Sequence, residues 1–245
     1  MHSNDDDSTT LAIHGAGGGG WEWEIWRRVW AAQQQRFVAP DLMPGADGLG
    51  RTAISDYLDQ LRHVAAALRR PCLIGASLGG LLALLLAQEL DAAALVLVDP
   101  VPPSGIAPRP VARAATGDIV PWGSQRRFDS TRRALPDADA AAQHHAFRRW
   151  RDESAAVLLA AQAGVAAPSP RCPVLVIAAT RDEVVPTATS LALAQQLGAE
   201  FWRCGCSHVG ALLGRSAAMT ASRVHAWVQS ATIVTAKSQV PPGTE

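Results

Sequence analysis

The sequence predicts an α/β fold: a mostly parallel central sheet flanked by helices and interrupted by one helical cap insertion. Six short apolar runs show no alternation with polar residues, which is typical of strands covered on both faces. Helical patterns separate most of these runs, and strand–helix alternation of this kind builds a parallel sheet through right-handed crossovers. The 245 residues, 48% of them hydrophobic, are enough to bury one sizeable core.

The elements are expected in the following order. Trp23, Trp26 and Trp30 have the spacing of one helical face and are expected in the core. Residues 54–68 carry apolar side chains at helical spacing, and a nearly all-apolar helix begins at Leu78. The expected strands span residues 11–15, 37–41, 72–75, 94–100, 173–180 and 199–204, and the later helices span residues 187–197 and a terminal segment that ends near Trp227.

The strand–helix rhythm breaks at residues 101–170, which are rich in proline, alanine and arginine. This segment contains no convincing strand, carries helical patterns, and is too long for an ordinary loop. We therefore expect residues 1–100 and 171–230 to form an α/β core and residues 101–170 to form a helical cap or lid insertion. Residues 231–245 are expected to form a polar C-terminal tail.

Composition and charge argue against several classes of protein. The 22 basic and 22 acidic residues balance to a formal charge of zero, which gives no electrostatic reason to expect nucleic-acid binding. No apolar run is long enough to span a bilayer, and the acidic N-terminus lacks the pattern of a signal peptide. Four cysteines without a secretory signal favour reduced thiols. The sequence thus predicts a cytoplasmic monomer or homodimer without a membrane span.

A serine flanked by glycines, Ser77, lies between an expected strand and the helix that begins at Leu78. Ligands of an open parallel sheet bind at the carboxyl ends of its strands. The turn is sharp, and Gly75 and Gly79 allow the close backbone approach that it requires. The helix N-terminus favours negative charge there. Because a serine hydroxyl is a poor nucleophile alone, it needs a base and a group that orients this base.

Two later residues can meet these needs. Asp182 follows one expected strand, and His208 follows the next, so both side chains are expected at the sheet edge that carries Ser77. His208 would accept the serine proton, and Asp182 would hold its tautomer. Asp99, which ends another strand, is a competing acid. His225 lies within a helical pattern and is expected to be structural.

The glycine-rich sequence HGAGGGG, residues 14–20, follows the first expected strand. Its backbone can approach a substrate closely, and the N–H groups of Ala16 and Leu78 would form a two-donor oxyanion hole. The residues expected to contact substrate are His14, Gly15, Gly17 and Trp21, with His14 shaping the loop and Trp21 reaching the pocket mouth.

Cys204, Cys206 and His208 alternate near the end of the last expected strand. Their spacing matches no zinc motif and lacks a fourth ligand, so a strand end with small residues is the preferred interpretation. No metal or organic cofactor is expected.

Together these motifs resemble the α/β-hydrolase superfamily. The resemblance covers residues 11–228 apart from the insertion, and it includes an HG loop, a G-x-S-x-G turn, an acid in RDEVVP and a histidine in SHVG. It implies a serine hydrolase with Ser77, Asp182 and His208 as its triad and with the oxyanion hole named above. Residues 38–52 resemble the segment after the family's third strand but lack its customary histidine, which affects the pocket wall and not the triad.

The predicted function is hydrolysis of a small-molecule carboxylic ester through an acyl-enzyme at Ser77. A thioesterase acting on an acyl-CoA or acyl-carrier thioester is the alternative, because residues 104–170 contain nine arginines against six acidic residues, a net charge of +3. A solvated helix face is the commoner explanation of such arginines. The alternative of another class is a ligand-binding receptor that keeps the hydrolase pocket and has little turnover.

Overall fold

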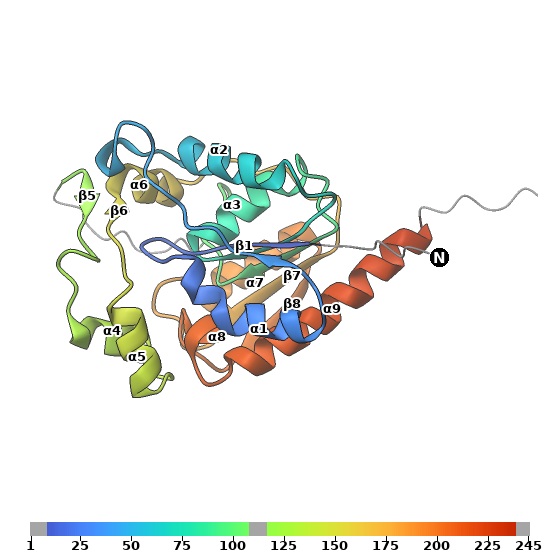
Figure 1. Cartoon of the computed structure of the whole chain (residues 1–245). Coiled ribbons are helices and arrows are strands. Elements are labelled where there is room, and N and C mark those ends of the chain that lie inside the picture. The colour runs from blue at the N-terminus through green and yellow to red at the C-terminus, as the bar shows by residue number, and fades with distance from the viewer. Residues whose placement is uncertain (1–8, 108–116, 239–245) are drawn as a thin grey trace, which may run out of the picture.

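A six-stranded parallel sheet forms the centre of the molecule (Figure 1). The computed structural model describes residues 9–107 and 117–238. Its strands lie in the order β2-β1-β3-β4-β7-β8, and every neighbouring pair is parallel. The predicted fold class is confirmed, and each strand falls within or beside a predicted range. The strands are β1 (Thr10–Ile13), β2 (Phe37–Val38), β3 (Cys72–Ala76), β4 (Ala94–Val98), β7 (Val174–Ala179) and β8 (Glu200–Cys204).

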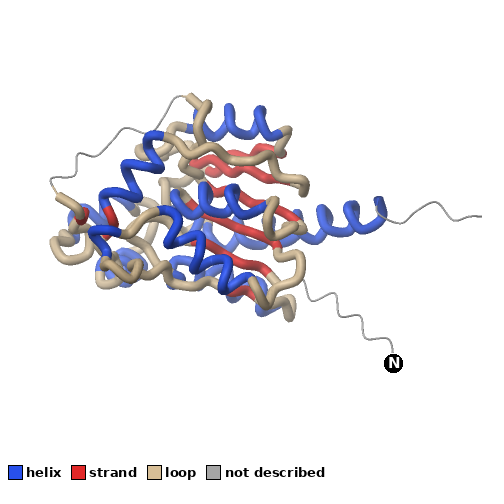
Figure 2. Tube along the Cα trace, turned by 90° about the horizontal axis from the view of Figure 1, so that it is seen from above, coloured by secondary structure: helices blue, strands red, loops and turns tan. Residues whose placement is uncertain are grey.

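Side chains of the strands alternate between two apolar layers, one on each face of the sheet. Leu73 and Leu95 belong to one layer, and their neighbours Ile74 and Val96 belong to the other. Helices cover both layers, as the view in Figure 2 shows, and this double burial explains why the strands read as unbroken apolar runs. One layer contains residues of α2 (Ile54–Ala65), α3 (Leu78–Ala87) and α7 (Thr187–Leu197), and the other contains residues of α1 (Glu24–Ala32), α8 (Gly210–Leu213) and α9 (Ala217–Ser238).

The tryptophans at the start of the chain are core residues, as predicted. Trp23 ends a short 3-10 helix, η1 (Gly20–Trp23), and Trp26 and Trp30 follow in α1. All three are fully buried. The indole N–H of Trp26 donates to the carbonyl of Ala211 at 3.0 Å, and that of Trp30 donates to Thr10 Oγ1 at 2.9 Å. These bonds tie α1 to α8 and β1 beside the glycine-rich loop.

The segment between β4 and β7 lies at the left of Figure 1, beyond the ends of the sheet strands. It contains α4 (Phe128–Ala134), α5 (Ala140–Phe147) and α6 (Ala155–Ala163), as the helical patterns predict. It also contains the antiparallel pair β5 (Ile119–Val120) and β6 (Glu153–Ser154), so the expectation of no strand there is wrong. Strands of two residues are too short to leave an alternating pattern. The division into a core and a cap stays a prediction, and residues 108–116 of the insertion lie outside the described residues.

The C-terminal helix is longer than the sequence pattern predicts. α9 runs from Ala217 to Ser238, so it continues through much of the segment that was expected to be a tail from residue 231. Residues 1–8 and 239–245 lie outside the described part of the chain. None of the helices in the described ranges is both long enough and apolar enough to cross a bilayer. A further 3-10 helix, η2 (Leu49–Arg51), precedes α2.

Candidate active site

Ser77 lies at the turn between β3 and α3, where its backbone adopts φ 53° and ψ −119°. This is a strained conformation for a residue with a side chain, and such strain is found mostly at functional sites. The neighbouring glycines make the turn possible. A Cβ atom at Gly75 would collide with the carbonyl oxygen of Gly79, and one at Gly79 would collide with that of Ile13. The predicted need for glycine at both positions therefore has a steric cause.

A continuous chain of hydrogen bonds joins Ser77, His208 and Asp182. His208 lies between β8 and α8, and its Nε2 is 3.0 Å from Ser77 Oγ. Its Nδ1 is 2.7 Å from Oδ2 of Asp182, which lies between β7 and α7. The other oxygen of Asp182 accepts from the N–H groups of Val184, at 2.6 Å, and Val185, at 2.9 Å. The structure thus brings together the three side chains selected from the sequence, at the carboxyl ends of their strands.

The electrostatic surroundings of His208 favour its charged form. Burial is the largest single influence and lowers the pKa of the imidazole. The hydrogen bond to Asp182 and the charge of this carboxylate are the main influences that outweigh burial, and they bring the pKa above its usual 6.5. His208 is therefore able to take up a proton while it remains in contact with Ser77.

Asp99 lies next to this chain of hydrogen bonds, but the two ring nitrogens of His208 are hydrogen-bonded to Asp182 and Ser77 instead. Asp99 directly follows β4 and is 1% exposed. Its Oδ1 accepts from the N–H of Ala179 at 2.6 Å, and its Oδ2 has no hydrogen-bond partner among the described residues. Of the two acids considered from the sequence, Asp182 and not Asp99 is hydrogen-bonded to His208.

Some N–H groups of the glycine-rich loop already have acceptors. Gly17 N–H donates to Glu153 Oε2 at 3.0 Å, and Gly18 N–H donates to the carbonyl of Gly15 at 3.2 Å. Within the described ranges the N–H groups of Ala16 and Leu78 have no acceptor. These are the two N–H groups selected from the sequence as oxyanion donors.

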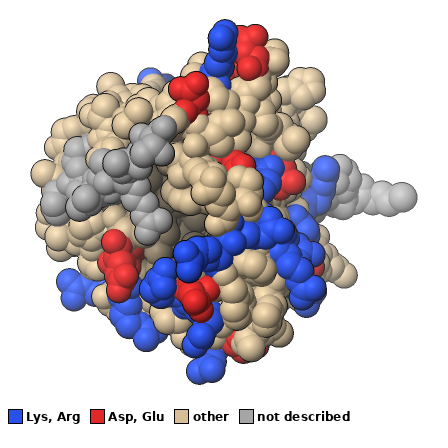
Figure 3. Space-filling model, turned by 90° about the vertical axis from the view of Figure 1, so that its left-hand side faces the viewer, with Lys and Arg blue, Asp and Glu red and all other residues tan. Residues whose placement is uncertain are grey.

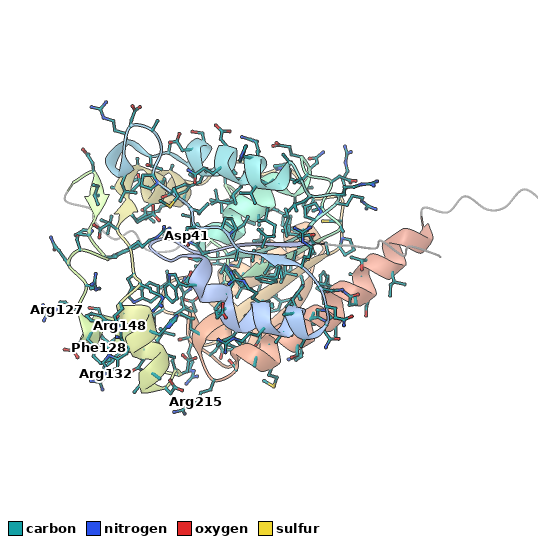
Figure 4. All side chains as sticks on the ribbon, viewed as in Figure 1. Asp41, Arg127, Phe128, Arg132, Arg148 and Arg215 are labelled. Atoms are coloured by element: carbon teal, nitrogen blue, oxygen red, sulfur yellow. The ribbon has the colours of Figure 1, made fainter. Side chains whose placement is uncertain are left out.

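Arg151 of the insertion forms hydrogen bonds to the glycine-rich loop and to the neighbouring Leu42. Arg151 N–H donates to the carbonyl of Gly17 at 2.8 Å, and its Nε donates to that of Gly18 at 2.7 Å. Its Nη2 donates to the carbonyl of Leu42, also at 2.7 Å. On the core side, Asp41, labelled in Figure 4, accepts from Gly20 N–H at 2.7 Å. The loop is therefore held at several points, which fixes the direction of the Ala16 N–H.

A cavity of about 440 Å³ opens beside Ser77, between the core and the insertion. Most of its lining area is apolar, and both the core and the insertion also contribute polar side chains. A cavity of this size and character suits a small, mostly apolar molecule. The core contributes Gly15, Ala16, Gly17, Glu22, Ser77, His208 and Leu212 to its wall, and the insertion contributes Val120, Trp122, Arg126, Arg127, Thr131 and Trp150.

Only part of the predicted substrate-contacting set lines this cavity. Gly15 and Gly17 do, whereas His14 and Trp21 do not. His14 Nδ1 is 2.8 Å from the carbonyl of Gly15, and its Nε2 accepts from Leu42 N–H at 2.9 Å. Burial lowers the pKa of His14 to about 4, so it is a neutral residue that shapes the loop. The ring of Trp21 packs edge-on against those of His145 and Trp150.

Several pocket residues have no signal in the sequence, among them Glu22, Trp122 and Trp150. Glu22 stands between two tryptophans in a segment that reads as core, yet its carboxyl lies against Gly18, where a Cβ atom would overlap it. Burial raises the pKa of Glu22 to about 8. The two tryptophans belong to the insertion, where no strand–helix rhythm indicates which side chains face inward.

The cysteines near His208 are not arranged as its metal-binding partners. Both ring nitrogens of His208 contact Ser77 and Asp182, and the sulfur atoms of Cys204 and Cys206 lie 2.8 Å from each other. Both are free thiols. In the described part of the chain, the only cluster with potential metal-ligand atoms near one another is Asp99, Asp182 and His208 itself.

Comparison with known proteins identifies the family of the chain. The model of the alpha/beta hydrolase family matches residues 11–221. The chain belongs to this family. A search of curated proteins finds no significant match.

Solved structures share the fold over nearly the whole chain. A pyrethroid hydrolase from Sphingobium faniae is 20% identical, with a TM-score of 0.68 over 91% of this chain and 98% of that one. A methylesterase from Arabidopsis is 13% identical, with a TM-score of 0.71 over 89% and 98%. A methylketone synthase variant from tomato is 13% identical, with a TM-score of 0.70 over 90% and 98%. At these identities the similarity shows the fold alone.

Proposed function

We propose that this member of the alpha/beta hydrolase family is a serine hydrolase that cleaves small carboxylic esters through an acyl-enzyme at Ser77. The observation that carries the proposal is the hydrogen-bonded sequence Ser77–His208–Asp182 beside two N–H groups without acceptors. A nucleophile, a base, an orienting acid and oxyanion donors are the parts that acyl transfer needs. Here Ser77, His208 and Ala16 lie at the wall of one cavity.

In the first half of the reaction, Ser77 Oγ attacks the ester carbonyl carbon while His208 Nε2 takes the hydroxyl proton. The carbonyl oxygen becomes an oxyanion, which the N–H groups of Ala16 and Leu78 stabilise. His208 then gives its proton to the leaving alkoxide, so an alcohol departs and the acyl group stays on Ser77. Asp182 stabilises the imidazolium throughout these steps. In the second half, water takes the place of the alcohol, and the carboxylic acid is released.

An ester is favoured as the substrate class by the cavity and by the comparisons. The largely apolar wall suits an acyl or alkyl group. Solved structures of similar fold include proteins named as a methylesterase and a pyrethroid hydrolase, which supports an esterase activity for this chain.

A thioester with an anionic carrier is the second candidate, because arginines gather near the cavity. Arg127 lines its wall, and Figure 4 places Arg127, Arg132 and Arg148 around α4 and α5. Figure 3 shows basic side chains in a band across this side of the molecule. Arg132 is 3.9 Å from Asp129, and both side chains are well exposed. Such exposed charges act weakly on their own, so an anionic carrier would have to contact several of them at once.

Labelling with a fluorophosphonate probe tests the nucleophile, and a hydrolysis panel tests the substrate. We expect covalent labelling of the wild-type protein at Ser77 and none of Ser77→Ala. The panel compares p-nitrophenyl esters of increasing chain length with acyl-CoA thioesters of the same acyl groups. Faster turnover of the esters supports an esterase, and faster turnover of acyl-CoA supports the second candidate. A folded wild-type protein that is neither labelled nor active would favour the ligand-binding receptor instead.

A further inference from the structure

Two carboxyl groups lie at the ends of neighbouring strands behind His208. Asp99 directly follows β4, and Asp182 lies in the loop after β7. These strands pair in parallel with Val98 opposite Ile177, so the two chain segments leave the sheet side by side. One carboxylate oxygen from each acid and one ring nitrogen of His208 lie within 4.8 Å of one another. The two acids are therefore close enough for the charge of one to affect the ionisation of the other.

The hydrogen-bond partners of the two carboxyl groups are unequal. Asp182 accepts three hydrogen bonds, one from His208 and two from backbone N–H groups. Asp99 accepts one, from Ala179 N–H at 2.6 Å. Its second oxygen is buried, and no donor reaches it in the parts of the chain that the structure describes. A buried acceptor without a donor is costly, so the state of this oxygen needs a chemical explanation.

A proton on Asp99 supplies that explanation. An ionised carboxylate only accepts hydrogen bonds, whereas a protonated one also donates. Two ionised carboxylates in a shared buried site repel each other, so such pairs hold one proton between them. Burial is the largest cause that raises the pKa of Asp99 well above its usual value. The charge of Asp182 raises the pKa further, and the charge of His208 and the Ala179 N–H oppose this increase.

The backbone at Asp99 is also held in an uncommon conformation. Its φ is +44°, a left-handed conformation that residues with side chains seldom adopt. The N–H of Asp99 donates to the carbonyl of Ile177 at 2.9 Å, which fixes this conformation against β7. Strain of this kind persists where the surrounding structure imposes it, and it is most frequent at functional sites.

We propose that Asp99 holds the proton of an Asp99–Asp182 carboxyl pair and donates it in a hydrogen bond to Asp182. Asp99 is then a positioning residue. Its hydrogen bond fixes the carboxylate of Asp182, which orients His208. Because Asp99 is neutral, the pair places a single negative charge behind the imidazole. The kinetic part of this inference rests on the proposed hydrolase function.

Substitution of Asp99 by asparagine or by alanine distinguishes three roles: a hydrogen-bond donor to Asp182, an ionised triad acid and a residue that only fills space. Asn matches a protonated Asp, because its oxygen can accept from Ala179 N–H and its NH₂ group can donate to Asp182. We expect Asp99→Asn to keep kcat/KM for a p-nitrophenyl ester within about threefold of wild type, whereas Asp99→Ala loses about tenfold or more. In Asp99→Ala the acid limb of kcat/KM also moves to higher pH, because Asp182 without its donor attracts the His208 proton more strongly.

Two kinetic results would overturn the inference. A loss of about 10⁴-fold in Asp99→Asn would mean that Asp99 works as an ionised triad acid. Equal losses in both variants, with the acid limb unmoved, would mean that Asp99 only fills space. The titratable groups that face Asp99 are Asp182, His208 and Cys206. Asp99→Asn and Asp99→Ala both keep these three groups, so a difference between their pH profiles comes from position 99.

A second readout needs no turnover. In protein labelled with ¹³C at the aspartate carboxyl carbons, the Asp99 signal is assigned by its loss in Asp99→Asn. We expect it to show the protonated form at pH 7. If the protein cleaves no ester but this signal is protonated, the proposed function fails and the carboxyl pair stands. A signal that titrates near pH 4 would show that Asp99 is ionised at neutral pH and would exclude the pair.

Discussion

Asp137 accepts two hydrogen bonds from Ser207, the residue directly before His208. The N–H of Ser207 donates to Oδ2 at 2.7 Å, and its hydroxyl donates to Oδ1 at 2.6 Å. Asp137 lies between α4 and α5, within the insertion, whereas Ser207 belongs to the loop after β8. The insertion therefore fixes the loop that carries the proposed base, in addition to lining the cavity.

Removing this contact should impair catalysis without removing any reacting group. We expect Asp137→Ala to lower kcat for a p-nitrophenyl ester by about 10–100-fold, because small displacements of a catalytic group cost this much. Asp139→Ala is the matched control. Asp139 caps α5 from the same connecting segment and accepts from Ala142 N–H at 2.7 Å, away from Ser207. The control should cost about 1 kcal/mol of stability and leave kcat unchanged. Equal kcat losses in the two variants would show that general loosening of the insertion is responsible.

The pH dependence of hydrolysis should report the environment of His208. The imidazole must be neutral to accept the Ser77 proton, and the pKa of His208 is raised above its usual 6.5. The kcat/KM of the wild-type protein should therefore decline as the pH falls, with a midpoint above 6.5. Asp182 supplies the strongest of the raising influences, through its hydrogen bond and charge.

In Asp182→Asn the acid limb should accordingly move to lower pH, and kcat should fall by about 10⁴-fold, the loss typical of a triad acid. The rate of fluorophosphonate labelling gives the same profile where turnover is too slow to follow. If the acid limb of Asp182→Asn has the same midpoint as that of the wild-type protein, Asp182 is not the group that raises the pKa of His208.

The sheet and the Ser77–His208–Asp182 geometry could be predicted because each depends on local features of the chain. Strands buried on both faces read as apolar runs, and each of the three side chains lies within a few residues of a strand end. Contacts that reach across the insertion could not be predicted in this way. Asp137 and Glu153 look like ordinary polar residues in the sequence, and their partners, Ser207 and Gly17, are 70 and 136 residues away. Only the folded chain shows such pairs.

The buried carboxyl of Glu22 should make stability depend on pH. Its pKa rises from the ordinary 4.5 to about 8 on folding, because burial disfavours the charged form. Folding therefore favours the protonated form. The contribution of Glu22 to stability is complete below about pH 4.5 and is lost as the pH rises through about 8. Arg151 and the N–H groups of Gly19 and Gly15 oppose this effect but do not cancel it.

Glu22→Gln keeps the size of the side chain and removes its titration, so it isolates this contribution. Asp99 also has a raised pKa and contributes a slope of the same sign in both proteins, so the difference between them reports Glu22 alone. We expect urea denaturation to give a free energy of unfolding that falls less steeply from pH 4.5 to 8 in Glu22→Gln than in wild type. Parallel curves would show that Glu22 is ionised in the folded protein at neutral pH. The cavity wall beside Ser77 would then carry a negative charge, which would disfavour the oxyanion that the proposed mechanism requires.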